Sequence, residues 1–201
     1  MARTGRLKSH LDGQAYHVMN RTVRQAFLFD DDVTKEWIYK EILALASIYF
    51  VDLHAIAVMS NHYHIVLTVR KPELRERDVQ ARFEQYQKRN RHPKIWRQWL
   101  LDEWIRRLTD LSAFMQDLNL TISRYVNKRD RVRGRLWGDR FKSTLLDDDV
   151  GFLRYIEGIG ERVLGDISRG TGIGGHITWN WLYIPILAFG FEEVLPIVAC
   201  F

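Results

Sequence analysis

Hydrophobic and polar residues alternate along three short stretches near the start of the chain, and a period of two is typical of β-strands. The three stretches are residues 14–20, 50–59 and 62–69. Ser60 and Asn61 separate the second stretch from the third, and both residue types favour turns. The pattern therefore predicts a first strand and, further along the chain, a β-hairpin.

Hydrophobic residues at helical spacing predict the elements around these strands. A helix is expected over residues 30–49, whose three leading aspartates supply an N-cap and partners for the helix dipole. A second helix is expected over 111–125, and a short third one over 147–161, again with three leading aspartates. Residues 134–146 are predicted to form a further strand. The densely charged segment 71–110 is predicted to be a helical insertion outside the sheet.

The composition agrees with one globular domain over residues 1–201. Hydrophobic residues make up 46% of the chain and charged residues 27%, and the alternation of predicted strands and helices indicates an α+β fold. No apolar run of about 18 residues is free of charge, which argues against a membrane span. The only cysteine, Cys200, is compatible with a reducing compartment, so we expect a cytoplasmic protein.

His62 and His64 stand two apart at the start of the third predicted strand. Successive side chains of a strand point to opposite faces, so both imidazoles share one face and Tyr63 points to the other. Imidazole is the commonest metal-binding side chain, and two on one face can converge on a single divalent ion. The pair alone is equally compatible with one hydrogen-bonded core histidine and one surface histidine. His17 and His54, on the other two predicted strands, are expected to be structural.

Positive charge is concentrated in one part of the chain. The net charge is +5, and between Arg124 and Lys142 the only acids are Asp130 and Asp139. Clustered cations neutralise phosphates, and aromatic side chains among them stack on unpaired bases at about 1–3 kcal/mol each. This stretch is therefore predicted to bind nucleic acid. The predicted DNA contacts are Arg124, Lys128, Arg129, Arg131, Arg133, Arg135, Trp137, Arg140 and Lys142.

Four motifs, taken in order, resemble the REP-associated tyrosine transposases of the single-tyrosine HUH superfamily. Residues 16–21 (YHVMNR) resemble their opening strand. Residues 59–64 (MSNHYH) resemble the HUH motif, in which a hydrophobic residue stands between two histidines. Residues 125–129 (YVNKR) and 134–143 (GRLWGDRFKS) are similar to their basic strand, and 154–157 (RYIE) to their tyrosine-bearing helix.

The resemblance implies a ferredoxin-like antiparallel sheet with helices on one face, plus the helical insertion and a C-terminal extension. It implies that His62 and His64, on a central strand, hold Mg²⁺ or Mn²⁺. The implied activity is that of a DNA transposase and single-strand endonuclease, which cleaves and rejoins single-stranded DNA through a 5′-phosphotyrosine intermediate on Tyr155. The implied partner is single-stranded or hairpin DNA, including repetitive palindromic elements, bound by a monomer or a homodimer.

The likeness covers about residues 10–165, and three departures from the family pattern leave alternatives open. Tyr125 is a second candidate nucleophile, and the chain has Phe141 rather than a tyrosine in the basic strand. Ile159 stands where such enzymes carry a polar residue, and the divergent tail at about 166–201 does not match them. Two other interpretations are therefore weighed: a catalytically inactive nucleic-acid-binding module, and a metal-dependent phosphodiesterase.

Overall fold

The structure is a computed structural model that describes residues 13–71, 74–146 and 181–183. The strands are β1 (Gln14–Arg21), β2 (Val51–Val58), β3 (His62–Val69), β4 (Lys142–Leu146) and β5 (Trp181–Tyr183). The α-helices are α1 (Asp32–Ala46), α2 (Glu76–Gln87), α3 (Leu101–Leu108) and α4 (Leu111–Arg129), and the 3₁₀ turns are η1 (Val23–Gln25) and η2 (Gln98–Leu100). These strands form one sheet in the order β4-β1-β3-β2-β5, and all neighbours are antiparallel.

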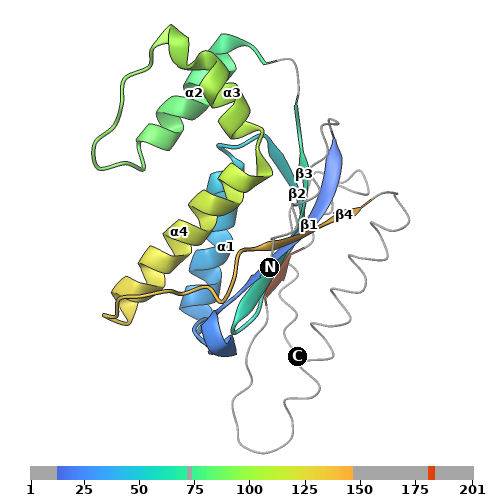
Figure 1. The fold of residues 1–201 in the computed structure, drawn as a ribbon, viewed down its shortest axis with the longest axis vertical. Helices are drawn as coiled ribbons and strands as arrows, with labels where there is room; N and C mark the ends of the chain where they lie inside the picture. The colour runs from blue at the N-terminus through green and yellow to red at the C-terminus, as the bar shows by residue number, and fades with distance from the viewer. Residues whose placement is uncertain (1–12, 72–73, 147–180, 184–201) are drawn as a thin grey trace, which may run out of the picture.

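The order of elements along the chain gives the fold its class. β1, α1, β2, β3, α4 and β4 follow the β-α-β-β-α-β pattern, with β1 and β3 in the middle of the sheet, and this is the ferredoxin-like arrangement. α2, η2 and α3 lie between β3 and α4 in the chain and outside the sheet (Figure 1). The predicted α+β fold, with its helical material at 71–110, is confirmed.

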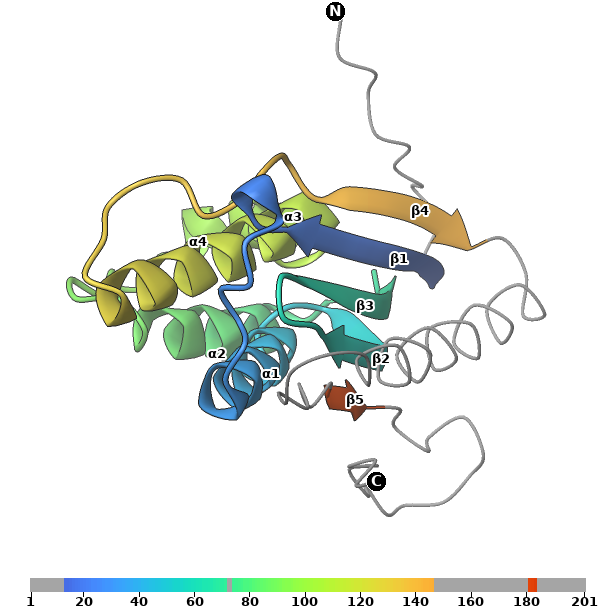
Figure 2. The same ribbon diagram turned by 90° about the horizontal axis from the view of Figure 1, so that it is seen from below.

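Helices α1 and α4 run side by side along one face of the sheet (Figures 1 and 2). The strand side chains that face them are fully or almost fully buried, as the alternating pattern predicts: Tyr16 and Val18 on β1, and Tyr63, Ile65 and Leu67 on β3. Burial of apolar surface stabilises the fold by about 25 cal/mol per Å². It favours this one pairing register, because a slip of one residue would expose the whole set of hydrophobic side chains. By the same alternation, the other face of the sheet carries His17 on β1 and His62 and His64 on β3.

The first helix begins where its acidic cap predicts. Asp31 is the N-cap of α1, and its carboxylate accepts a 2.7 Å hydrogen bond from the backbone N–H of Thr34. α1 ends at Ala46, a few residues before the predicted end near Tyr49. The side chains of Ile38, Ile42 and Leu45 form its buried stripe.

The strand predicted over 134–146 is shorter in the structure and begins at Lys142. The residues before it instead form backbone hydrogen bonds with residues at the end of β1 and just after it. The backbone N–H of Val23 donates to the carbonyl of Leu136 at 2.8 Å, and that of Gly138 donates to the carbonyl of Arg21 at 3.0 Å. Those two bonds form an isolated antiparallel bridge between Thr22 and Trp137, and the continuous ladder with β1 begins at Lys142.

Parts of the prediction lie outside the described residues. They include the helix expected over 147–161, Tyr155 within it, and the tail at 166–201 except β5, which pairs with β2 at one edge of the sheet. Among the described helices, none has the length and hydropathy of a membrane span.

A buried polar cluster joins the helices to the two central strands. The side-chain oxygen of Asn119 on α4 accepts from the Tyr63 hydroxyl at 2.8 Å and from the Asn20 amide at 3.0 Å. The backbone carbonyl of Asn119 accepts from the Trp137 indole N–H at 2.9 Å. One residue of α4 thus sets the position of β1, β3 and the loop before β4.

We expect Asn119→Ala to lower the free energy of unfolding by about 2–4 kcal/mol, because it leaves two buried donors without their acceptor. Tyr63→Phe removes only one of these hydrogen bonds and keeps the ring, so its cost should be clearly smaller. Urea unfolding followed by circular dichroism measures both. Equal stability of Asn119→Ala and the wild type would show that the cluster does not hold the layers together.

Candidate functional site

The two histidines of β3 lie on the face of the sheet opposite α1 and α4. Both are half-buried, and Tyr63 between them is fully buried on the helix side, as strand alternation predicts. The ring centroids of His62 and His64 are 5.0 Å apart and the ring planes differ by 79°. Across the β1–β3 ladder, His62 is opposite Arg21 and His64 is opposite Met19.

His62 is oriented by its neighbour in the chain. Its Nδ1 lies 2.6 Å from the side-chain oxygen of Asn61, and the Asn61 amide nitrogen donates to the carbonyl of Gln25 at 2.9 Å. An amide oxygen only accepts, so Nδ1 of His62 carries the proton. The neutral ring then has its lone pair on Nε2.

His64 has a buried histidine as its partner. The Nε2 atom of His17 lies 2.8 Å from Nδ1 of His64, and His17 is 5% exposed. The sequence analysis assigned His17 a structural role and did not place it beside the pair. Strand register, which sets His17 one step diagonal to His64 on the same face of the sheet, brings the two rings together. His54 instead contacts the Thr68 hydroxyl at 2.7 Å.

The donor set fits a divalent cation. Histidines that ligate a metal through one ring nitrogen almost always hydrogen-bond through the other, and both Nδ1 atoms of the pair make such contacts. Within 13–71, 74–146 and 181–183, no group of three or more His, Cys, Asp or Glu residues is arranged to hold a metal. His62 and His64 could therefore supply two ligands and leave other coordination positions to water or a substrate oxygen, as in catalytic sites.

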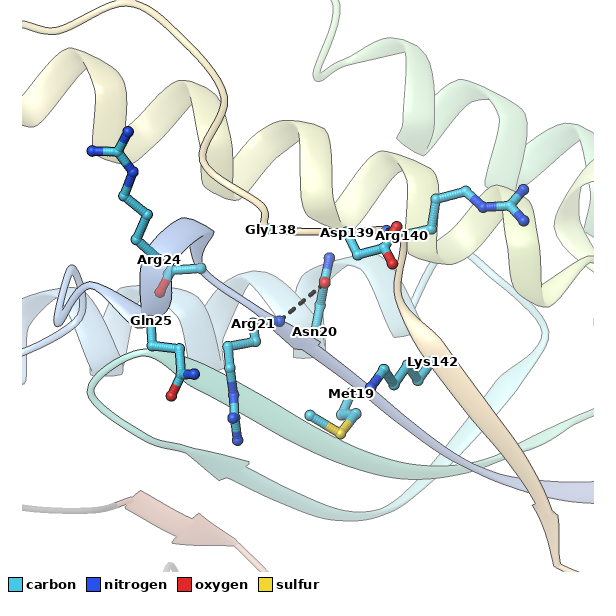
Figure 3. Close-up of a pocket in the computed structure, with 10 residues that line it drawn as sticks. Met19, Asn20, Arg21, Arg24, Gln25, Gly138, Asp139, Arg140 and Lys142 are labelled. Carbon is cyan, nitrogen blue, oxygen red and sulfur yellow. Dashed lines mark hydrogen bonds between the residues drawn. The ribbon is translucent and has the colours of Figure 1, made fainter. Parts of the chain in front are cut away.

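A cleft of about 550 Å³ lies at the end of β1, beside the histidines. Figure 3 shows its residues, with Arg24 and Arg140 projecting on opposite sides. The cleft is lined by Met19, Asn20, Arg21, Thr22, Arg24, Gln25, Gly138, Asp139, Arg140 and Lys142. Its four cations, Arg21, Arg24, Arg140 and Lys142, are exposed and form no ion pair with another described residue.

Strand register connects the cleft to the histidines. Met19 is paired with His64 on one side and with Lys142 on the other, so these three side chains share one row across the sheet. Two strand spacings separate Lys142 from His64, about 10 Å, which a lysine side chain largely spans. Lys142 therefore lines the cleft and shares a row with His64, which lies outside the cleft lining.

One wall of the cleft is a strained turn. Arg24 and Gln25 have φ of 54° and 57°, a left-handed conformation that costs non-glycine residues about 1–3 kcal/mol each. The Thr22 hydroxyl, which donates to the carbonyl of Ala26 at 2.7 Å, helps to hold the turn. Asn61 also holds it, through Gln25, so the residue that orients His62 supports this wall too.

The opposite wall is a loop that approaches β1 closely. A side chain at Gly138 would place Cβ 3.2 Å from the backbone oxygen of Thr22, so glycine permits this approach. Trp137 beside it packs edge-on against Phe29 and Tyr63, besides its hydrogen bond to Asn119. Trp137, one of the predicted DNA contacts, therefore anchors the loop with its half-buried ring.

Arg129 also differs from the other predicted contacts. Its guanidinium forms ion pairs with Asp31 and Asp130 and donates to the hydroxyl of Thr34 and the carbonyl of Leu28. It therefore ties the end of α4 to the start of α1. The remaining predicted cations outside the cleft are exposed on α4 and on the loop that leads to the cleft: Arg124, Lys128, Arg131, Arg133 and Arg135. Sequence reasoning missed Arg21 and Arg24, which lie outside the basic stretch.

The described tyrosines include one candidate nucleophile. The Tyr125 ring stacks on Trp37 of α1, with centroids 3.8 Å apart and planes within 7°. That contact is in the helix layer, on the other side of the sheet from His62 and His64. Tyr63 is also on that side, and burial raises the pKa of its hydroxyl far above the ordinary value.

Solved structures to which this chain is similar include two transposases. A REP-associated tyrosine transposase bound to a REP hairpin has a TM-score of 0.47 and 12% identity, over 79% of this chain and 74% of that chain. A predicted transposase from Deinococcus radiodurans R1 has a TM-score of 0.37 and 15% identity, over 77% of this chain and 97% of that chain. No family model and no curated protein matches the chain. A functional assignment therefore depends on the geometry of the site.

The structural role of Arg129 is testable against a neighbouring arginine. We expect Arg129→Gln to lower the free energy of unfolding by about 1–2 kcal/mol, because two partly exposed ion pairs and two other hydrogen bonds are lost. Arg131→Gln, at an exposed position two residues away, should leave stability within about 0.5 kcal/mol of the wild type. Thermal or urea unfolding compares the two, and equal losses would contradict the assignment.

Proposed function

We propose that this protein is a single-tyrosine HUH DNA transposase, a nuclease and strand transferase that acts on single-stranded DNA. The observation that carries the proposal is the arrangement of His62 and His64. They share one face of a central strand, each with Nδ1 held by a neighbour. His64 lies in a row with Lys142 of a cationic cleft, and His62 is opposite Arg21 of the same cleft. The motif order described above adds independent support.

Each group in the site has a role in this proposal. His62 and His64 hold a divalent cation, Mg²⁺ or Mn²⁺, which when bound would polarise the scissile phosphate. Arg21, Arg140 and Lys142 neutralise phosphates along the cleft and orient the strand. The Tyr155 oxygen bonds to phosphorus and gives up its proton. The bond to the 3′ oxygen breaks, leaving a 5′-phosphotyrosine and a 3′-OH.

The choice of Tyr155 over Tyr125 follows from position. The Tyr125 ring is stacked between the two helices that cover the opposite face of the sheet, so the sheet stands between it and the histidine pair. Tyr155 lies outside the described residues, and its assignment rests on the resemblance of residues 154–157 to the tyrosine-bearing helix.

A covalent adduct tests the activity. In the presence of Mn²⁺, the wild type should convert a pool of 3′-labelled DNA hairpins with randomised single-stranded flanks into an SDS-resistant protein–DNA species. His62→Ala and His64→Ala should each lower the yield at least about 100-fold, because a metal-assisted step worth several kcal/mol is lost. Binding of the same pool, measured by fluorescence anisotropy, should stay within about threefold of the wild type.

Tyr155→Phe is the matched variant, since it removes the nucleophilic oxygen and keeps the ring. It should bind DNA and give no adduct. An adduct that persists in Tyr155→Phe and disappears in Tyr125→Phe would overturn the choice of nucleophile. Binding without cleavage by the wild type would identify a nucleic-acid-binding module. Cleavage without any adduct would identify a metal-dependent phosphodiesterase.

The cleft should account for part of the salt dependence of DNA binding. Replacing Arg21, Arg140 and Lys142 together with glutamine should weaken binding and make the slope of log K against log salt shallower by about 2, because each phosphate contact on a single strand contributes about 0.7. Anisotropy titrations between low and moderate salt measure the slope.

A control with the same change of net charge uses exposed cations on helices away from the cleft. Replacing Lys40, Arg77 and Lys88 with glutamine should leave the slope nearly unchanged. Equal effects of the two triple variants would show that net charge, rather than the cleft, attracts the strand.

A further inference from the structure

The contact between His17 and His64 restricts the ring geometry closely. Their nitrogens are 2.8 Å apart, their ring centroids 5.0 Å apart and their planes within 14° of parallel. With the two nitrogens so close, the ring centroids can be 5.0 Å apart only if the rings meet edge to edge rather than face to face. The hydrogen bond therefore lies close to the plane of both rings, which is its most favourable direction.

The direction of that hydrogen bond decides whether His64 can ligate a metal. If His17 donated, Nδ1 of a neutral His64 would accept and Nε2 would carry the proton, with no lone pair for an ion. If His64 donates from Nδ1, its lone pair is on Nε2, on the far side of the ring from His17. His17 then accepts at Nε2 and carries its own proton on Nδ1.

His62 already has this second arrangement. Its Nδ1 donates to Asn61, whose amide orientation is set by the hydrogen bond to Gln25. Only when His64 is in the same tautomer do both rings offer Nε2 lone pairs on their shared face of the sheet. His17 cannot itself join such an ion beside His64, because its Nε2 faces Nδ1 of that ring.

We propose that His17 is a positioning residue that holds His64 as the Nδ1–H tautomer and so prepares its Nε2 to bind the cation. The inference rests on the proposed metal site. It assigns a role to His17, which lies outside the HUH motif at residues 59–64. A histidine suits this role because it is 5% exposed on an inner strand, paired with Val66 on one side and Thr144 on the other. There the contact to His64 is shielded from solvent, which strengthens the hydrogen bond between the two rings.

Two variants separate acceptance of the hydrogen bond from filling of space. His17→Gln keeps an accepting oxygen near the same position, whereas His17→Phe keeps a ring and has no acceptor. The first measurement is the tautomer of His64, by long-range ¹H–¹⁵N NMR on the full chain without metal. The sample pH is above the ordinary pKa range of imidazole, so that the ring is neutral. We expect the Nδ1–H form in the wild type and His17→Gln, and its loss in His17→Phe.

The second measurement is the affinity for Mn²⁺ alone, by EPR titration. His17→Phe should bind about 10- to 100-fold more weakly than the wild type, the usual effect of losing an outer partner of a metal ligand, and His17→Gln within about threefold. His54→Phe is the control, because His54 contacts Thr68 and not the pair; it should change neither the tautomer nor the affinity.

The outcomes distinguish this inference from the proposed function. An Nε2–H tautomer of His64 in the wild type, or a tautomer and affinity unchanged in His17→Phe, overturns the role of His17. A tautomer that depends on His17 in a protein that binds no Mn²⁺ supports the control of the ring by His17 and contradicts the metal site. An equal loss of Mn²⁺ affinity in His17→Gln and His17→Phe shows a packing effect and also overturns the inference.

Discussion

Pairing of β1 with β3 places His62 opposite Arg21 and His64 opposite Met19, and the further pairing of Met19 with Lys142 extends that row to β4. The same register puts the buried Tyr16 and Val18 opposite Leu67 and Ile65 on the other face. A slip of one residue would turn the histidines into the core and expose the hydrophobic set. The burial energy that stabilises the fold therefore also determines which side chains surround the site.

Short polar contacts orient the side chains that the strand register brings together. Asn61 holds Nδ1 of His62 and the strained turn at Gln25, and Asn119, beneath the sheet, joins α4 to β1, β3 and Trp137. These contacts hold the imidazoles and both walls of the cleft on one rigid scaffold. Rigidity suits a site that has only two protein ligands among the described residues, because little else would orient a cation there.

Much of the fold was predictable from local patterns. Alternation gave the phase of β1 and β3 and hence the common face of His62 and His64, and Asp31 marked the start of α1. What depended on tertiary structure could not be read from the sequence. His17 joined the pair only through strand register, and Arg21 and Arg24 joined Arg140 and Lys142 only because the 136–138 loop folds back on the end of β1. Trp137 and Arg129 are predicted DNA contacts, and their hydrogen bonds and ion pairs inside the fold could not be predicted from the composition of that stretch.

The proposed function requires that His62 and His64 together bind a divalent cation that contacts a DNA phosphate. Electron spin-echo envelope modulation of Mn²⁺ bound to the full chain tests it most directly, because it identifies the nuclei that surround the ion. We predict couplings to imidazole ¹⁴N from two rings, reduced to one ring in His62→Ala or His64→Ala, and a ³¹P coupling after addition of a single-stranded DNA hairpin. A spectrum with no imidazole ¹⁴N, or one unchanged in both variants, would contradict the account.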